Sequence, residues 1–164
     1  MKYKTKIEFL RSGIMTSIQG KQIQNMQHYG VTTSGPMDYF LSTIGNIILD
    51  NEEDSLCFEI CKFGPIIKIV EGKFVFLISG NINFKITSNE KILIGKSFKS
   101  YILNKGDILE LNETKDRNYA YLNFKGLLNI EKNNKLNSTV ISSSIGINNG
   151  KKINNFDQFY ISYF

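Results

Sequence analysis

The chain has 164 residues, of which 41% are hydrophobic, and a formal net charge of +5 at pH 7. This size and composition predict one packed domain and exclude a disordered chain. The lysines are scattered and form no dense basic run interleaved with aromatic residues, so we expect no nucleic-acid partner.

The start of the chain shows no targeting signal. The lysines within residues 1–6 precede no apolar segment of the kind found in a signal peptide. No apolar run approaches the ~18 residues that a membrane span needs. We therefore expect a cytoplasmic protein without a membrane partner.

Two short strands are predicted first, over residues 2–10 and 14–18, and a polar loop over residues 20–25 follows them. The segment from Gln27 to Asp38 then leads into the one convincing helix pattern, and it contains the only histidine of the chain, His28. Glycines and a proline lie on either side of its polar centre. They predict a rigid, exposed turn, the kind of loop on which a ligand site is often built.

Two interpretations of this turn stay open. In the functional one, His28, Ser34 and Asp38 belong to a ligand site. In the structural one, the lone histidine is an ordinary hydrogen-bonded residue, and Ser34 and Asp38 supply acceptors for free N–H groups at the start of the helix. A Ser-His-Asp triad is excluded, because nothing resembles a nucleophile elbow and closeness in sequence is not triad geometry.

A helix is predicted from about Asp38 to Leu49. Its apolar residues recur at helical spacing, and its polar residues gather on another face. The apolar positions are Phe40, Leu41, Ile44, Ile47 and Ile48, and the polar positions are Ser42, Thr43 and Asn46. Gly45 weakens a helix by about 1 kcal/mol relative to Ala, and it indicates close packing against a sheet.

From Ser55 onward, short β-branched and aromatic runs alternate with turn signals. They predict strands over residues 56–61, 66–70, 74–78, 84–86, 91–94, 101–103, 108–111 and 119–124. Many short strands and one helix favour an all-β barrel or sandwich with a flanking α-helix. After Gly126 the chain is polar and loop-like. The tail over residues 156–164 is β-prone, either an added strand or an exposed sticky end.

The two cysteines, Cys57 and Cys61, lie in one predicted strand about 13 Å apart, which exceeds the reach of a disulfide. Two cysteines and one histidine are too few for a closed zinc site. We therefore expect two buried free thiols and no metal. The sequence also lacks a P-loop and a dinucleotide-binding fingerprint, so no cofactor is expected to bind this chain alone.

Several motifs, in order, resemble the biotin-dependent carboxyltransferase-like family, whose members include subunits of allophanate hydrolase and of 5-oxoprolinase. The main one is the run from Gln27 to Asp38, which reads Gln-His-x-Gly-Val-x-x-Ser-Gly-x-Met-Asp. The others keep the family's order from about residue 12 to about residue 153. They are Gly13 to Gln19, Phe58-Glu59-Ile60, Gly64-Pro65, Ser79-Gly80, Ala120-Tyr121-Leu122 and Ser138-Thr139.

The resemblance implies a cyclophilin-like β-barrel in one member of a complex that hydrolyses or carboxylates a small amide, such as 5-oxoproline or allophanate. It implies partner subunits and ATP for the complex, but no ATP bound by this chain alone. The resemblance also implies which matching residues face the site. The candidate catalytic residues are His28, Asp38 and Glu59. The candidate substrate-binding residues are Gln27, Ser34 and Gly35.

The chain also departs from the family pattern. The family's Asp-x-Gly-Arg-x-Gly segment is replaced by residues 20–25, and the family's length is about twice 164 residues. We therefore expect residues 1–153 to form the family's first barrel and residues 154–164 to be the truncated start of its second half. Two alternatives to a catalytic role in the complex stay open: a non-catalytic partner-binding or regulatory remnant, and a decaying gene product without a role.

Overall fold

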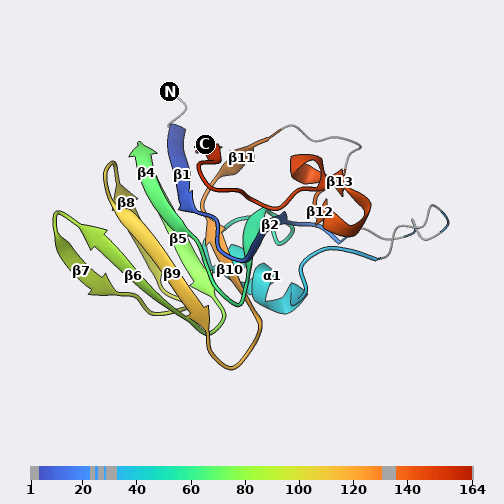
Figure 1. The fold of residues 1–164 in the computed structure, drawn as a ribbon, viewed down its shortest axis with the longest axis horizontal. Helices are drawn as coiled ribbons and strands as arrows, with labels where there is room; N and C mark the ends of the chain where they lie inside the picture. The colour runs from blue at the N-terminus through green and yellow to red at the C-terminus, as the bar shows by residue number, and fades with distance from the viewer. Residues whose placement is uncertain (1–3, 23–24, 26–27, 29–32, 131–135, 164) are drawn as a thin grey trace.

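The computed structural model describes residues 4–22, 25, 28, 33–130 and 136–163. Its fold is mostly β, as predicted, with two antiparallel sheets and one short α-helix (Figure 1). The larger sheet has the order β11-β14-β1-β4-β9-β6-β7, formed by Leu127–Asn129, Gln158–Ser162, Lys4–Arg11, Ile66–Glu71, Ile108–Thr114, Ile82–Ser88 and Lys91–Ile94. The smaller has the order β2-β3-β10-β5-β8, formed by Met15–Gln19, Cys57–Cys61, Tyr119–Phe124, Lys73–Ser79 and Ser100–Asn104.

A small ribbon lies beside the smaller sheet. It consists of β12 (Thr139–Val140) and β13 (Ile145–Gly146), and two 3-10 helices adjoin it, η3 (Ile141–Ser143) and η4 (Ile147–Gly150). The sequence does not predict this ribbon or β11, because residues 127–150 are rich in Asn and Ser, which favour turns. Their pairing comes from tertiary contacts, which local composition does not reveal.

The closed barrel that the resemblance implied is not formed by the described residues. Strands β7 and β8 follow one another in the chain, but each is the last strand of a different sheet. Residues 95–99 cross from one sheet to the other without pairing them. The two sheets therefore pack as separate layers around a common core.

Phenylalanine rings from both sheets make the centre of that core. The rings of Phe9 in β1 and Phe58 in β3 lie 5.1 Å apart, edge to face, and the rings of Phe58 and Phe124 in β10 lie 5.5 Å apart. All three side chains are fully buried. Side chains alternate between the two faces along a strand. The neighbours of Phe58 and Phe124 in the sequence, Glu59 and Asn123, therefore point to the outer face of the smaller sheet.

The C-terminal segment is an added strand rather than a sticky end. Strand β14 lies between β1 and β11, and Phe159 pairs with Ile7 while Ile161 pairs with Leu128. Both β14 residues are buried in the common core. This pairing brings the two ends of the chain side by side (Figure 1).

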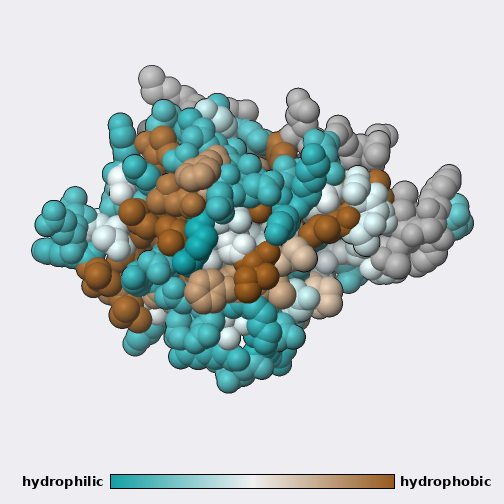
Figure 2. Space-filling view, viewed as in Figure 1, coloured by the Kyte–Doolittle hydropathy of each residue, from teal (hydrophilic) through white to brown (hydrophobic). Residues whose placement is uncertain are grey.

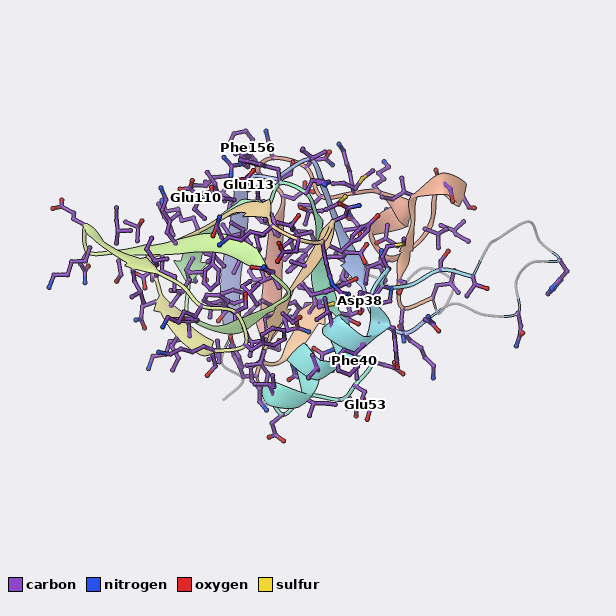
Figure 3. The ribbon with its side chains drawn as sticks, turned by 90° about the horizontal axis from the view of Figure 1, so that it is seen from below. Asp38, Phe40, Glu53, Glu110, Glu113 and Phe156 are labelled. Atoms are coloured by element: carbon purple, nitrogen blue, oxygen red, sulfur yellow. The ribbon has the colours of Figure 1, made fainter. Side chains whose placement is uncertain are left out.

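The predicted helix is confirmed as α1, Tyr39–Ile48. Asp38 is its N-cap, and its Oδ1 accepts a hydrogen bond from the backbone N–H of Leu41 at 3.1 Å. The structural interpretation of Asp38 is therefore correct, because the carboxylate satisfies one of the free N–H groups at the helix start. Figure 3 shows Asp38, Phe40 and Glu53 on the side of α1, away from Glu110 and Phe156.

The helix turns its polar face, rather than its apolar face, toward the sheet. The buried helix residues are Ser42, Gly45 and Asn46. Asn123 in β10 donates from Nδ2 to the backbone oxygen of Ser42 and to Oδ1 of Asn46, both at 2.9 Å, and its Oδ1 accepts from Ser79 Oγ at 3.0 Å. The outer face of the sheet is polar at this place, so the polar face of the helix is the complementary one.

As a result, several large apolar residues of the helix region face solvent. The exposed ones are Met37, Tyr39, Phe40, Ile47 and Ile48. The helical periodicity predicted the helix, but the partner surface decided which face is buried. Contiguous exposed apolar residues mark interaction sites in many soluble proteins.

Gly45→Ala is expected to destabilise the fold by about 1–3 kcal/mol through overpacking. A Cβ at this position would lie 2.1 Å from Asn123 Oδ1. In an exposed helix the same change stabilises by about 1 kcal/mol. The sign of the change in unfolding free energy therefore shows whether this face of the helix is packed or exposed. Urea unfolding measures it. The control Ile47→Ala, on the exposed face, should change the unfolding free energy by less than about 0.5 kcal/mol.

Both cysteines are free, as predicted. Cys57 is fully buried, and burial raises the pKa of its thiol, whereas Cys61 is half-buried. Within the described parts of the chain, no helix has the length and apolar character to span a membrane.

Candidate functional site

A pocket of about 400 Å³ lies at one end of the smaller sheet. Its walls come from β2, from β3 and β10, from the chain segment before α1, and from the β12 ribbon with η3. Its polar lining residues include Ser17, Gln19, Ser34, Glu59, Tyr119 and Thr139. None of the described residues that line the pocket is Lys, Arg or His.

Glu59 is the buried acid of this pocket. Glu59 lies in the middle of β3, opposite Ser17 in β2 and Tyr121 in β10. It is only 7% exposed. Its Oε2 accepts two hydrogen bonds, from the backbone N–H of Met37 at 2.7 Å and from the hydroxyl of Tyr121 at 2.8 Å. One carboxylate oxygen is therefore held in place by the protein.

The same tyrosine ties the pocket to the helix. Tyr121 is fully buried, and its hydroxyl oxygen accepts from the backbone N–H of Asp38 at 2.7 Å while it donates to Glu59. The bonds from Met37 and Tyr121 thus fix the chain segment that leads into α1 against the acid. Burial and the nearby Glu59 carboxylate raise the pKa of Tyr121, which keeps this hydroxyl a donor.

The second oxygen of Glu59, Oε1, makes no hydrogen bond with the described residues. Glu59 lines the pocket, and this oxygen is the part of its carboxyl that no described residue holds. Burial raises the pKa of the Glu59 carboxyl, and the two hydrogen bonds to Oε2 lower it to a smaller extent. A carboxyl with a raised pKa can take up and release a proton nearer neutral pH.

Gln19 forms the wall next to this acid. Its Nε2 donates to Ser17 Oγ at 2.9 Å and to the backbone oxygen of Thr139 at 3.2 Å. Its Oε1 is buried and has no hydrogen-bond partner in the described structure. A buried acceptor without a donor is unusual in a folded protein, so this wall of the pocket is rich in acceptors.

The structure brings together three of the residues predicted for the site. Glu59, Ser34 and Gly35 all line the pocket. Gly35 has a φ of +143° and its Cα lies close to Gln22, where a Cβ would meet Gln22 at 3.0 Å. A side chain at this position would therefore push against the wall of the pocket.

Two other predicted residues, His28 and Asp38, do not line this pocket. His28 is exposed, and Gln27 lies outside the described residues. Asp38 caps α1 and forms an ion pair with Arg117, with Oδ2 3.1 Å from Nη1. It lines a larger neighbouring groove of about 520 Å³, together with Phe40, Leu41 and Phe98. That groove is mostly apolar and does not contain Glu59.

Sequence reasoning missed Gln19, Tyr119 and Tyr121 as parts of the site. The alternation of residues along the strands was a sign of a shared site. These residues and Glu59 occupy alternate positions of three strands and so lie on one face of the sheet. The strand order β2-β3-β10 and the register that places Ser17, Glu59 and Tyr121 side by side were needed to recognise it. Neither can be read from a single sequence.

The raised pKa of Glu59 predicts a pH-dependent stability. The folded chain holds a proton on Glu59 at pH values where the unfolded chain, with the ordinary pKa of 4.5, has lost it. This contribution to the unfolding free energy is complete below pH 4.5 and is lost as the pH rises through the raised pKa. Glu59→Gln does not titrate. Urea unfolding across this range should show the variant gaining stability relative to the wild type, and a constant difference would contradict the assignment.

Comparison with known proteins places this fold among relatives. The family described as "Carboxyltransferase domain, subdomain A and B" matches residues 29–163. The structure of the K. lactis urea amidolyase is similar, with a TM-score of 0.85 and 24% identity over 97% of this chain and 9% of that chain. The Kluyveromyces lactis urea carboxylase has a TM-score of 0.81 and 24% identity over 97% of this chain and 14% of that chain.

The structure of TTHA0988 is also similar, with a TM-score of 0.81 and 16% identity over 96% of this chain and 30% of that chain. This chain therefore spans less than a third of each of these three proteins. A comparison with curated proteins finds no match. At these identities the likeness to solved structures shows a shared fold. The family match covers most of the sequence, and the chain belongs to the carboxyltransferase domain family, subdomains A and B.

Proposed function

We propose that this chain is part of a hydrolase or carboxyltransferase assembly that acts on a small amide, such as 5-oxoproline or a urea-derived allophanate. The observation that carries the proposal is the carboxylate of Glu59, which lines the pocket with Oε2 held by two hydrogen bonds and Oε1 held by no described residue. The names of two structural relatives, a urea amidolyase and a urea carboxylase, point to the same class of nitrogen compound. We also infer that the two packed sheets correspond to the family's cyclophilin-like barrel.

The pocket suits the amide part of such a substrate, which carries N–H groups. Glu59 Oε1 can accept such a hydrogen atom, and with a raised pKa the same carboxyl can relay a proton during the reaction. Ser34 and Gly35 also line the pocket, where a hydroxyl and backbone N–H groups can hold a carbonyl oxygen. An amide carries both kinds of group.

The pocket does not suit the phosphates of ATP. The described lining contains no Lys or Arg, and phosphates in proteins are held by these side chains or by glycine-rich loops. The described residues also hold no group of three or more His, Cys, Asp or Glu placed to bind a metal ion. We therefore propose that any ATP used by the assembly binds to a partner subunit.

A second candidate function is a partner-binding module without chemistry of its own. The outward-facing apolar side chains of the α1 region favour it, since Phe40 is 71% exposed and lines the groove beside Phe98. A partner that covers this groove would bury both rings. The two functions are compatible, because among the described residues the groove and the pocket share no lining residue.

The purified chain is expected to show no turnover of 5-oxoproline or allophanate by itself. Its pocket is open to water, and water weakens the electrostatic stabilisation of a transition state. Release of ADP and glutamate from 5-oxoproline, and of ammonia from allophanate, should be measured with the chain alone, and then after co-expression with a chain for the family's second half and a partner subunit. Turnover by the mixture supports the proposal. Turnover by the chain alone would contradict this prediction, and an inactive mixture in which no amide binds would contradict the proposed function.

A further inference from the structure

Strand β7 is an unprotected edge of the larger sheet. It pairs with β6 on one side, and no described strand pairs with its other side. All four of its residues, Lys91 to Ile94, are exposed. Figure 2 shows hydrophobic side chains at the left edge of the molecule, where Figure 1 places the β6–β7 hairpin. Such an edge is a template for pairing with another strand.

Three consecutive apolar residues make this edge unusual. Ile92, Leu93 and Ile94 are 64%, 53% and 71% exposed. Leu93 lies opposite the buried Ile86 in β6, so it extends the core face of the sheet, while the two isoleucines lie on the outer face. Folded proteins usually protect an edge with Pro, a bulge or several charges. This strand has one lysine and a regular register with β6.

The hairpin geometry shows which backbone groups point outward. Ser88 and Lys91 close a two-residue turn, whose residues Asn89 and Glu90 both have positive φ. Further along, the N–H of Gly95 donates to the oxygen of Phe84 in β6 at 3.0 Å. Because alternate residues of an antiparallel strand bond to the same neighbour, residues 91, 93 and 95 bond to β6. The N–H and C=O groups of Ile92 and Ile94 therefore point to the free side.

We propose that β7 pairs with β7 of a second copy of this chain, antiparallel, about a two-fold axis at Leu93. In this register Ile92 lies opposite the partner copy's Ile94, and each such pair exchanges two backbone hydrogen bonds. The outward groups of both isoleucines are then satisfied, and the two Leu93 side chains meet on the core face. The two larger sheets join into one continuous sheet.

The charges of the strand are compatible with this register. Lys91 lies opposite Gly95 of the second copy, so no like charges face each other across the pair. The contact uses one short strand from each copy, which is smaller than the roughly 800 Å² per partner of a standard interface. The expected dimer is therefore reversible and depends on concentration. This inference does not rest on the proposed amide chemistry.

Sedimentation of the full chain over a concentration series tests the dimer. The wild type should shift from the mass of one chain to that of two, and Ile92→Lys should raise the dissociation constant at least tenfold. Ile102→Lys is the matched control, because Ile102 is also an isoleucine on an edge strand, β8, and is 62% exposed. Circular dichroism checks that both variants fold. A monomer at all concentrations, or polymers larger than a dimer, would overturn the proposal. A dimer that Ile102→Lys disrupts and Ile92→Lys does not would also overturn it.

A cysteine pair tests the register independently. Leu93 and its copy form the central pair without hydrogen bonds, for which a Cα separation of about 4.5 Å is expected, within the range of a disulfide. Mild oxidation of Leu93→Cys should therefore give a covalent dimer. Ile94→Cys should not, because residue 94 lies opposite residue 92 of the second copy. Equal cross-linking of the two variants would overturn the register.

Discussion

In an assembled complex that turns over a small amide, Glu59→Gln is expected to lower kcat by about 10²–10⁴, the usual effect of losing one proton-transfer group. The amide oxygen of glutamine can still accept the hydrogen bonds that Met37 and Tyr121 donate. The fold should therefore survive, and the loss should appear in kcat rather than in the amount of folded protein. Steady-state kinetics and urea unfolding of the same preparation measure both quantities.

The control for this experiment is Glu53→Gln, an exposed acid after α1, which should leave kcat unchanged. His28→Ala and Asp38→Asn test the assignment that the sequence favoured. Both residues lie outside the pocket that contains Glu59. If either variant lowers kcat as much as Glu59→Gln does, the proton-transfer group belongs to the turn before α1 and not to the sheet.

The second large effect concerns stability, and the expected result is a loss of about 3 kcal/mol for Asn123→Ala. Asn123 is fully buried and makes hydrogen bonds with Ser42, Asn46 and Ser79. Alanine leaves these three groups without that partner, and each lost buried hydrogen bond costs about 1 kcal/mol. Urea unfolding gives the value. A change below about 0.5 kcal/mol, typical of a neutral surface substitution, would show that the polar contact does not hold the helix.

The same residue allows a coupling experiment with Gly45. The Cβ of Gly45→Ala would collide with the side chain of Asn123, and Asn123→Ala removes that side chain. Gly45→Ala should therefore be destabilising in the wild type and close to neutral or stabilising in the Asn123→Ala background. A double-mutant cycle measures this difference. Additive effects would mean that the two side chains do not limit the packing of α1.

The sequence was sufficient for the elements with strong periodicity. The limits of α1 agree with the predicted helix to within one residue at each end, and β7 and β10 have the predicted bounds. These segments have a regular apolar pattern between clear turn signals. The pattern did not indicate that α1 would bury Ser42 and Asn46, because the burial of a helix face depends on the surface beneath it. That surface is formed by strands from distant parts of the chain.

The site shows the same limit. Ser34, Gly35 and Glu59 were identified through family motifs, and they meet in one pocket. His28 and Asp38 belong to the same motif as Ser34 and are close to it in sequence. In the structure, the chain turns between Gly35 and Asp38, so that Asp38 pairs with Arg117 while Ser34 lines the pocket of Glu59. Proximity in the sequence is therefore a poor guide across a helix start.

The position of β14 has a consequence for how the chain folds during synthesis. The larger sheet places residues 158–162 between residues 4–11 and 127–129, so its contacts join segments that are far apart in the sequence. Until residue 162 has left the ribosome, one edge of β1 stays unpaired, and Ile7 and Phe9 lack the cover of Phe159. High contact order slows folding and leaves strands exposed to aggregation. We expect the nascent chain to be a client of chaperones and to become protease-resistant only after residue 162 has left the ribosome.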